Sequence, residues 1–137
     1  MNNLFSLVEA VVAGSMVFVL GQYILDFILR PMQQLRDQIS HTDYILGYYA
    51  NKLYRTDQDT EKIRLEFRSN AYELKRLVVL PHFYLLFHSI LRLPNKNKVF
   101  DASKNLIGFS NTIGKKDPED PKHHRESQIR DLLNLSA

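Results

Sequence analysis

The sequence predicts an all-α protein in which one N-terminal transmembrane helix continues into a small cytoplasmic bundle of helices. Residues 10–25 contain no charged side chain, and an apolar run of this kind is typical of a membrane span. In residues 31–137 apolar residues recur at spacings of three and four among charged ones, a pattern that is typical of amphipathic helices. The 137-residue chain contains no cysteine, which excludes disulfides, thiolate zinc sites and iron–sulfur clusters.

The apolar segment is long enough to cross a membrane. Between residues 4 and 29 the charged residues are Glu9 and Asp26 alone. At about 1.5 Å per residue, this segment covers roughly 39 Å. A secretory signal peptide would begin with basic residues, but positions 1–6 contain neither lysine nor arginine. We therefore expect residues 1–30 to form a transmembrane anchor, with a signal helix or a buried core helix as the alternatives. Asp26 stands four residues before Arg30 and can pair with it on one helix face.

The basic residues predict the orientation of this anchor. None precedes the apolar segment, whereas Arg30, Arg36, Lys52 and Arg55 follow it. The positive-inside rule then places the N-terminus outside and the C-terminus in the cytoplasm. We expect a single-pass protein of the inner (cytoplasmic) membrane.

A seam of apolar residues follows the predicted span, at alternating spacings of three and four. Its members are Met32, Leu35, Ile39, Thr42, Leu46, Tyr49 and Leu53. In the same register the seam extends back to Gly14 and Gly21, and small residues allow membrane helices to approach closely. The pattern predicts a homo-oligomer seam of Gly14, Gly21, Met32, Leu35, Ile39, Leu46, Tyr49 and Leu53. In the alternative, this helix packs against the bundle of its own chain, and Pro31 kinks it at the membrane.

The cytoplasmic domain, residues 31–114, contains two further helices with clear boundaries. The first begins at Thr56, with Asp59 as its capping-box partner, and ends before Pro81. Its apolar face consists of Ile63, Phe67, Ala71, Leu74 and Val78. The second follows Pro94, ends at Gly114, and has an apolar face of Val99, Ala102, Leu106, Phe109 and Ile113.

Residues 77–93 form an apolar segment next to a basic one. No charged residue appears in it before Arg92, and Pro81 interrupts it. The basic residues around it, against the single acid Asp101, are Arg92, Lys96, Lys98, Lys104, Lys115 and Lys116. We expect this group to contact anionic lipid or an anionic ligand. A core helix followed by a solvated basic face is the alternative, and a second membrane span is the least favoured interpretation.

Residues 115–137 have the composition of a linker followed by a short amphipathic helix. The apolar stripe of that helix is Ile129, Leu132, Leu133 and Leu135. Such a stripe can dock into the groove of a partner protein. It can equally fold back onto its own chain.

No catalytic motif is present in the sequence. There is no Gly-x-Ser-x-Gly elbow and no glycine-rich phosphate loop. His82 and His88 are six residues apart, a spacing that does not place them on one helix face. We therefore expect no catalytic residue, no metal and no cofactor, and nucleic acid is an unlikely partner.

Two proline-containing segments resemble those of known proteins. They are Arg30-Pro31 ahead of a helix, and Leu93-Pro94 leading into residues 101–111, DASKNLIGFSN. They are similar to segments of small uncharacterised bacterial single-pass membrane proteins with a helical cytoplasmic domain. The resemblance extends over most of the chain and implies the same architecture, but it brings no activity with it.

These observations favour a non-enzymatic, membrane-tethered interaction or scaffold protein. Its partners would be membrane lipid and either a second copy of itself, in a homo-oligomer, or another membrane protein. A second hypothesis is an oligomeric effector that perturbs or permeabilises the bilayer on sensing a signal. A third is an accessory subunit of a larger membrane complex.

Overall fold

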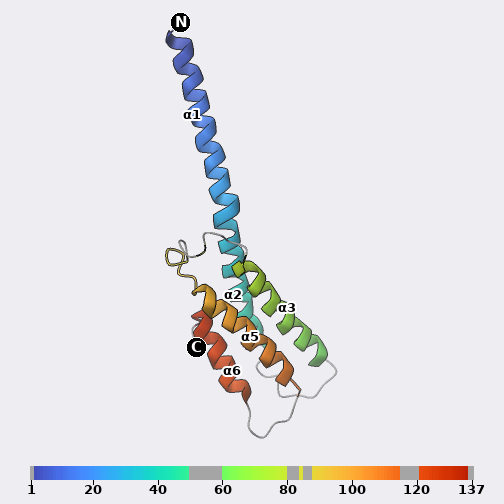
Figure 1. The fold of residues 1–137 in the computed structure, drawn as a ribbon. Helices are drawn as coiled ribbons and strands as arrows, with labels where there is room; N and C mark the ends of the chain where they lie inside the picture. Colours follow the sequence, from blue (N-terminus) through green and yellow to red (C-terminus); the bar gives the residue numbers. More distant parts are fainter. Residues whose placement is uncertain (1, 50–59, 80–83, 85–87, 115–120, 136–137) are drawn as a thin grey trace.

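The structure, a computed structural model, consists of one long N-terminal helix and a bundle of four helices (Figure 1). It describes residues 2–49, 60–79, 84, 88–114 and 121–135. The elements are α1 (Asn2–Ile24), a π-helical turn η1 (Leu25–Leu29), α2 (Arg30–Tyr49), α3 (Thr60–Val79), α5 (Lys96–Thr112) and α6 (Pro121–Leu133). The described part of the chain contains no strand, so the all-α prediction is confirmed.

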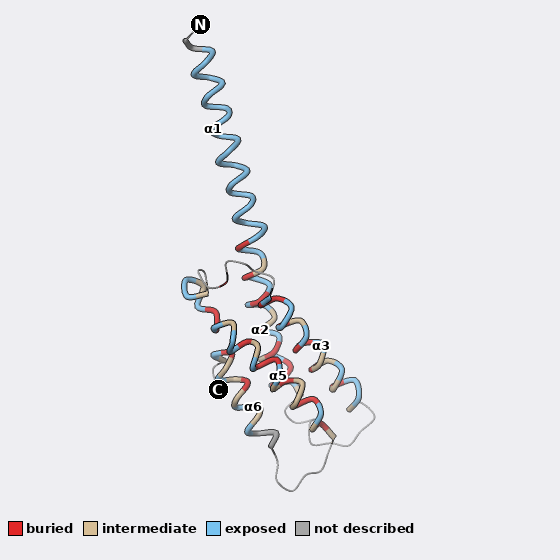
Figure 2. Tube along the Cα trace, viewed as in Figure 1, coloured by how far each residue is buried: buried red, intermediate tan, exposed pale blue. Residues whose placement is uncertain are grey.

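Helix α1 stands apart from the rest of the chain. Every side chain described between residues 4 and 27 is exposed, and Figure 2 shows the helix uncovered along this length. Its apolar side chains lie on all faces, which is typical of a helix covered by lipid or by other protein. The helix that begins at Leu4 is the one candidate membrane span within the described residues, judged by its length and apolar composition.

A π-helical turn joins α1 to α2 without a break in the helix. Pro31 has no N–H to donate, and its ring would collide with the carbonyl four residues earlier in a regular α-helix. Just before it, the Arg30 N–H donates to the Leu25 carbonyl, five residues back. Such a turn is wider than an α-helical one and accommodates the proline. Asp26 and Arg30 form the ion pair expected from their spacing, at 2.9 Å.

The four bundle helices alternate in direction. Helices α2 and α5 run away from α1, whereas α3 and α6 run back toward it (Figure 1). The apolar faces predicted for the two central helices are confirmed. All of their predicted members are buried: Ile63, Phe67, Ala71, Leu74 and Val78 on α3, and Val99, Ala102, Leu106, Phe109 and Ile113 on α5.

The ends of these helices mostly agree with the sequence. Helix α3 ends at Val79, before Pro81, whereas its predicted start at Thr56 lies outside the described residues. At the start of α5, the Asn95 side chain accepts a hydrogen bond from the Asn97 N–H. Gly114 follows α5 with a φ of 77°, a left-handed conformation that glycine adopts without strain.

The seam predicted on α2 lies inside the bundle. Met32, Leu35, Ile39 and Leu46 are buried in the core that α2 shares with the other helices of the same chain. This burial agrees with the alternative of packing on the chain's own bundle, while the homo-oligomer seam stays a prediction. Of the rest of the seam, the Tyr49 hydroxyl donates to the Glu66 carboxylate at 2.6 Å, while Leu53 lies outside the described residues.

The two seam glycines on α1 are in a different environment. Both Gly14 and Gly21 are exposed, and no atom lies within 4 Å of a Cβ placed on either. The seam of the sequence is thus divided between the bundle core and the uncovered helix.

Helix α6 is the fourth helix of the bundle and not a detached tail. Ile129 and Leu133 are buried in the core, and Leu132 and Leu135 pack against it. Arg130 connects α6 to α2 through an ion pair with Asp43 at 2.7 Å. The stripe therefore folds back onto its own chain, as the second of the two interpretations expects, while docking to a partner protein stays an untested prediction.

Candidate functional site

The strongest candidate site is the end of the bundle next to α1. It comprises the last turn of α3, Tyr84, residues 88–95 and the first turn of α5, which meet there because α3 runs toward α1 and α5 away from it (Figure 1). We call it the α1 end of the bundle.

A buried tyrosine fixes the backbone at this end. The Tyr84 side chain is fully buried, and its hydroxyl donates to the carbonyl of Pro94. Burial raises the pKa of Tyr84 to about 12. Leu93 and Pro94 are buried as well, so the segment that enters α5 is held against the core.

The turn formed by residues 88–92 projects an apolar side chain outward. The Leu93 N–H donates to the His88 carbonyl at 2.8 Å, which closes the turn. Arg92 has a φ of 53°, an uncommon conformation for a residue other than glycine. Ile90 is 72% exposed at this turn, whereas Leu91 packs partly against the core.

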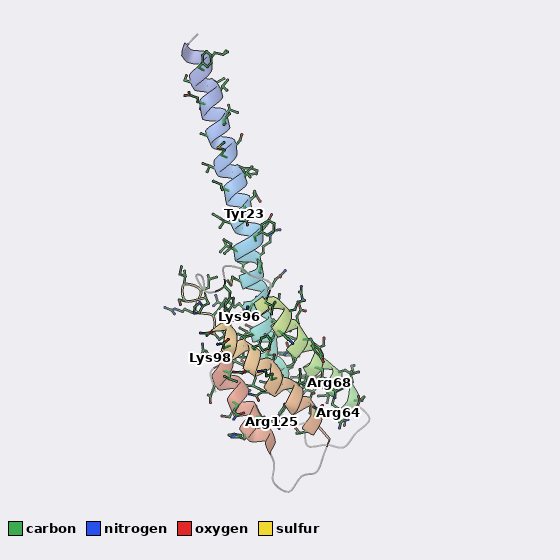
Figure 3. All side chains as sticks on the ribbon, viewed as in Figure 1. Tyr23, Arg64, Arg68, Lys96, Lys98 and Arg125 are labelled. Carbon is green, nitrogen blue, oxygen red and sulfur yellow. The ribbon has the colours of Figure 1, made fainter. Side chains whose placement is uncertain are left out.

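Three cations lie close to this apolar side chain in the sequence. Arg92 and Lys98 are exposed and Lys96 is half-buried. Figure 3 shows Lys96 and Lys98 on the part of α5 closer to α1. No acidic residue occurs between positions 88 and 100, and none of the three cations has an ion pair among the described residues. The segment of residues 88–98 therefore combines an exposed isoleucine with three positive charges and no acidic residue.

The other members of the predicted basic group do not belong to this site. Lys104 lies farther along α5, where it pairs with Asp101 at 3.2 Å and lies 5.5 Å from the centroid of the Phe100 ring. Its charge is already compensated. Lys115 and Lys116 lie outside the described residues. The structure thus brings together three of the six predicted cations.

The apolar segment of residues 77–93 has two parts. Leu77, Val78, Tyr84 and Leu93 belong to the core, while Val79 and Ile90 are exposed. Residues 80–83 and 85–87 lie outside the described part of the chain. The core-helix interpretation therefore describes the buried members, while contact of the exposed members with lipid or a ligand stays a prediction.

Sequence reasoning missed a buried polar network between α2 and α3. The Asn70 amide donates to the Thr42 hydroxyl at 2.9 Å, and the Gln38 amide donates to the Asn70 carbonyl oxygen. The Thr42 hydroxyl in turn donates to the Gln38 backbone carbonyl at 2.9 Å. The sequence did contain one sign of this network, because Thr42 is the single non-aromatic polar residue of the α2 seam. The network has a structural role, since every buried side-chain nitrogen and oxygen described has a partner.

Sequence reasoning also missed two arginines that flank the second half of α5. Arg68 of α3 donates to Asn111, and the Arg125 guanidinium of α6 lies against Gly108.

Within the described residues, no group of three His, Cys, Asp or Glu side chains is placed to hold a metal ion. Comparisons of the chain with models of protein families, with curated proteins and with solved structures gave no match.

Proposed function

We propose that this protein is a membrane-anchored, non-enzymatic interaction module. In this proposal α1 crosses the inner membrane and the bundle lies in the cytoplasm with its α1 end against the anionic leaflet. One observation carries the proposal: Ile90 and three cations that have no ion pair within the described residues lie at the same end of the bundle as the exposed apolar helix.

The physical basis of the membrane contact is the combination of charge and apolar surface. Lys and Arg near an anionic leaflet each contribute about 1 kcal/mol to membrane attraction. An exposed isoleucine at the same surface gains free energy by leaving water for the interfacial region. Arg92, Lys96 and Lys98 provide the first contribution and Ile90 the second.

The orientation is supported by the charge asymmetry around α1. Arg30, which pairs with Asp26, and Arg36 lie on the bundle side of α1, whereas α1 itself contains no lysine or arginine. Loops that carry Lys and Arg remain on the cytoplasmic side. The bundle is then a soluble platform held at the membrane surface, and its outward faces are available to partner proteins.

A tryptophan reporter tests this proposal directly, because the chain contains no tryptophan. We would reconstitute the full-length Ile90→Trp variant in vesicles whose acyl chains carry bromine, a quencher of tryptophan fluorescence. We expect strong quenching when the vesicles contain phosphatidylglycerol, and weaker quenching in pure phosphatidylcholine. Adding Lys96→Gln and Lys98→Gln should reduce the difference between the two lipids.

The matched control is Leu65→Trp. Leu65 is 58% exposed on the outer side of α3, in the part of that helix farther from α1, so its tryptophan should remain unquenched in both lipids. Equal quenching of the two reporters, or none at position 90, would show that the α1 end does not rest on the membrane.

A further inference from the structure

A second concentration of positive charge lies on the outer face of α5, in its second half. It is built from the segment Leu-Ile-Gly-Phe-Ser-Asn, residues 106–111, and from one arginine on each neighbouring helix. Arg68 comes from α3 and Arg125 from α6, and Figure 3 shows both at the end of the bundle away from α1.

Arg68 is held in place by neutral groups. Its Nη2 donates to the Asn111 side-chain oxygen at 2.7 Å, and its Nε donates to the Ser110 hydroxyl at 3.4 Å. The Ser110 hydroxyl is itself fixed by donating to the Ile107 carbonyl at 2.7 Å. The guanidinium is thus oriented by two partners that carry no charge of their own.

Arg125 occupies the space that a side chain at position 108 would fill. A Cβ on Gly108 would lie 2.0 Å from the Arg125 Nη1 and 3.2 Å from its Cζ. Glycine in the middle of a helix is otherwise unfavourable. Its presence here allows the guanidinium of Arg125 to lie directly on the backbone of α5.

Neither arginine has a carboxylate partner in the part of the chain that the structure describes, although its neighbours do. Arg64 pairs with Glu61 at 3.1 Å and also donates to the Ile113 carbonyl. Glu126, next to Arg125 in the sequence, pairs with Arg130 at 3.2 Å. The nearby described acids are therefore taken, and two positive charges remain.

The groups that face outward are hydrogen-bond donors. Positions 108 and 111 are neighbours on one helix face, about 5–6 Å apart; Arg125 of α6 lies against the first and Arg68 of α3 contacts the second. Since the Asn111 oxygen accepts from Arg68, its NH₂ group is left to donate. A cluster of donors with positive charge is complementary to an oxyanion.

We propose that Arg68, Arg125 and Asn111 bind the phosphate group of a soluble small molecule. Guanidinium groups match the oxygens of phosphate with paired hydrogen bonds. The location at the end of the bundle away from α1 favours a soluble phosphate over a lipid headgroup. This inference goes beyond the membrane-anchored module proposed above: the choice of a soluble phosphate rests on α1 crossing the membrane, but not on the contact made by Ile90.

Calorimetric titration of the full-length protein with pyrophosphate tests the site. The protein would be in a non-ionic detergent at constant ionic strength, with inorganic phosphate as a second probe. We expect saturable binding of pyrophosphate and a loss of affinity of about tenfold or more in Arg68→Gln and in Arg125→Gln, because each removes a charge-assisted interaction. Circular dichroism would verify that both variants are folded.

Gly108→Ala separates binding from stability. The added methyl group displaces the end of a flexible arginine, so the fold is kept, while alanine raises the melting temperature by about 3–6 °C. We expect this variant to be more stable and yet to bind pyrophosphate more weakly. The matched control is Gly47→Ala, because no atom lies within 4 Å of a Cβ at that position; it should keep full affinity.

Two results would overturn the proposal. One is the absence of saturable binding of either probe to the wild-type protein. The other is a Gly108→Ala variant that binds pyrophosphate as tightly as the wild type does, since the position of Arg125 would then be irrelevant. The fluorescence of the Ile90→Trp reporter is independent of both results.

Discussion

Tyr84 links the core to the α1 end of the bundle. It is among the largest fully buried side chains, and its hydroxyl donates to the Pro94 carbonyl just ahead of α5. Because an ionised phenol is costly to bury, the pKa of this hydroxyl is raised to about 12. The position of the turn that projects Ile90 therefore depends on a neutral tyrosine.

The raised pKa predicts how stability changes at high pH. A group whose pKa is higher in the folded protein than in the unfolded chain stabilises fully below the unfolded pKa, near 10, and this contribution is lost as the pH rises toward 12. Tyr84→Phe should lower the free energy of unfolding at pH 7 by about 1 kcal/mol, through the lost hydrogen bond. It should also reduce the fall in stability between pH 10 and 12.

Denaturant unfolding followed by circular dichroism, from pH 7 to 12, measures both effects. Tyr49→Phe is an informative comparison, because the pKa of Tyr49 is also raised to about 12 but chiefly by its hydrogen bond to Glu66. An unchanged fall above pH 10 in Tyr84→Phe would contradict the assignment.

At the scale of the elements, periodicity predicted which faces are apolar but not what covers them. The sequence located the apolar stripes of α2 and α6 and assigned other molecules as their partners, whereas in the structure both stripes pack in the core of their own chain. A spacing of three and four residues is the same for a helix that packs in its own bundle and for one that binds another chain. The ion pair between Arg130 and Asp43 joins residues far apart in the sequence, so sequence spacing could not reveal it.

The position of α6 in the core predicts a cost for removing Ile129. This side chain is fully buried, so Ile129→Ala should lower the free energy of unfolding by about 2–4 kcal/mol. Leu135→Ala, at a partly buried position of the same stripe, should cost clearly less. Chemical denaturation of both variants provides the comparison. If Ile129→Ala left stability unchanged and only abolished binding to another protein, α6 would be a docking peptide after all.

For the molecule as a whole, the sequence predicted the all-helical class, one long apolar helix and the core faces of α3 and α5. Of the candidate sites, it predicted the basic residues of the α1 end from composition alone. It could not predict that Gly108 makes room for Arg125, because this relation depends on tertiary contact. The pairing of Lys104 with Asp101, by contrast, follows from their three-residue spacing on a predicted helix. Self-association also remains a prediction, and it would have to use α1 or an exposed face, since the α2 seam is buried.

Leu46 distinguishes an internal core from an interface between copies. It is fully buried within one chain, so Leu46→Ala should cost about 2–5 kcal/mol of unfolding free energy. The denaturation midpoint should not change when the protein concentration is varied twentyfold. Tyr44→Ala, at an exposed position of the same helix, is the control and should have little effect. A midpoint that rises with protein concentration would return the seam to an intermolecular role.

The unbroken passage from α1 through η1 into α2 has a mechanical consequence. Consecutive helical turns resist twisting relative to one another, and α1, η1 and α2 follow one another directly, although Pro31 donates no backbone hydrogen bond at the junction. Any rotation of α1 about its own axis therefore turns the bundle through the same angle and moves the 88–92 turn along an arc around that axis. A torque applied to α1 would therefore also move the end of α5 that lies away from α1, without any change in how the bundle helices pack.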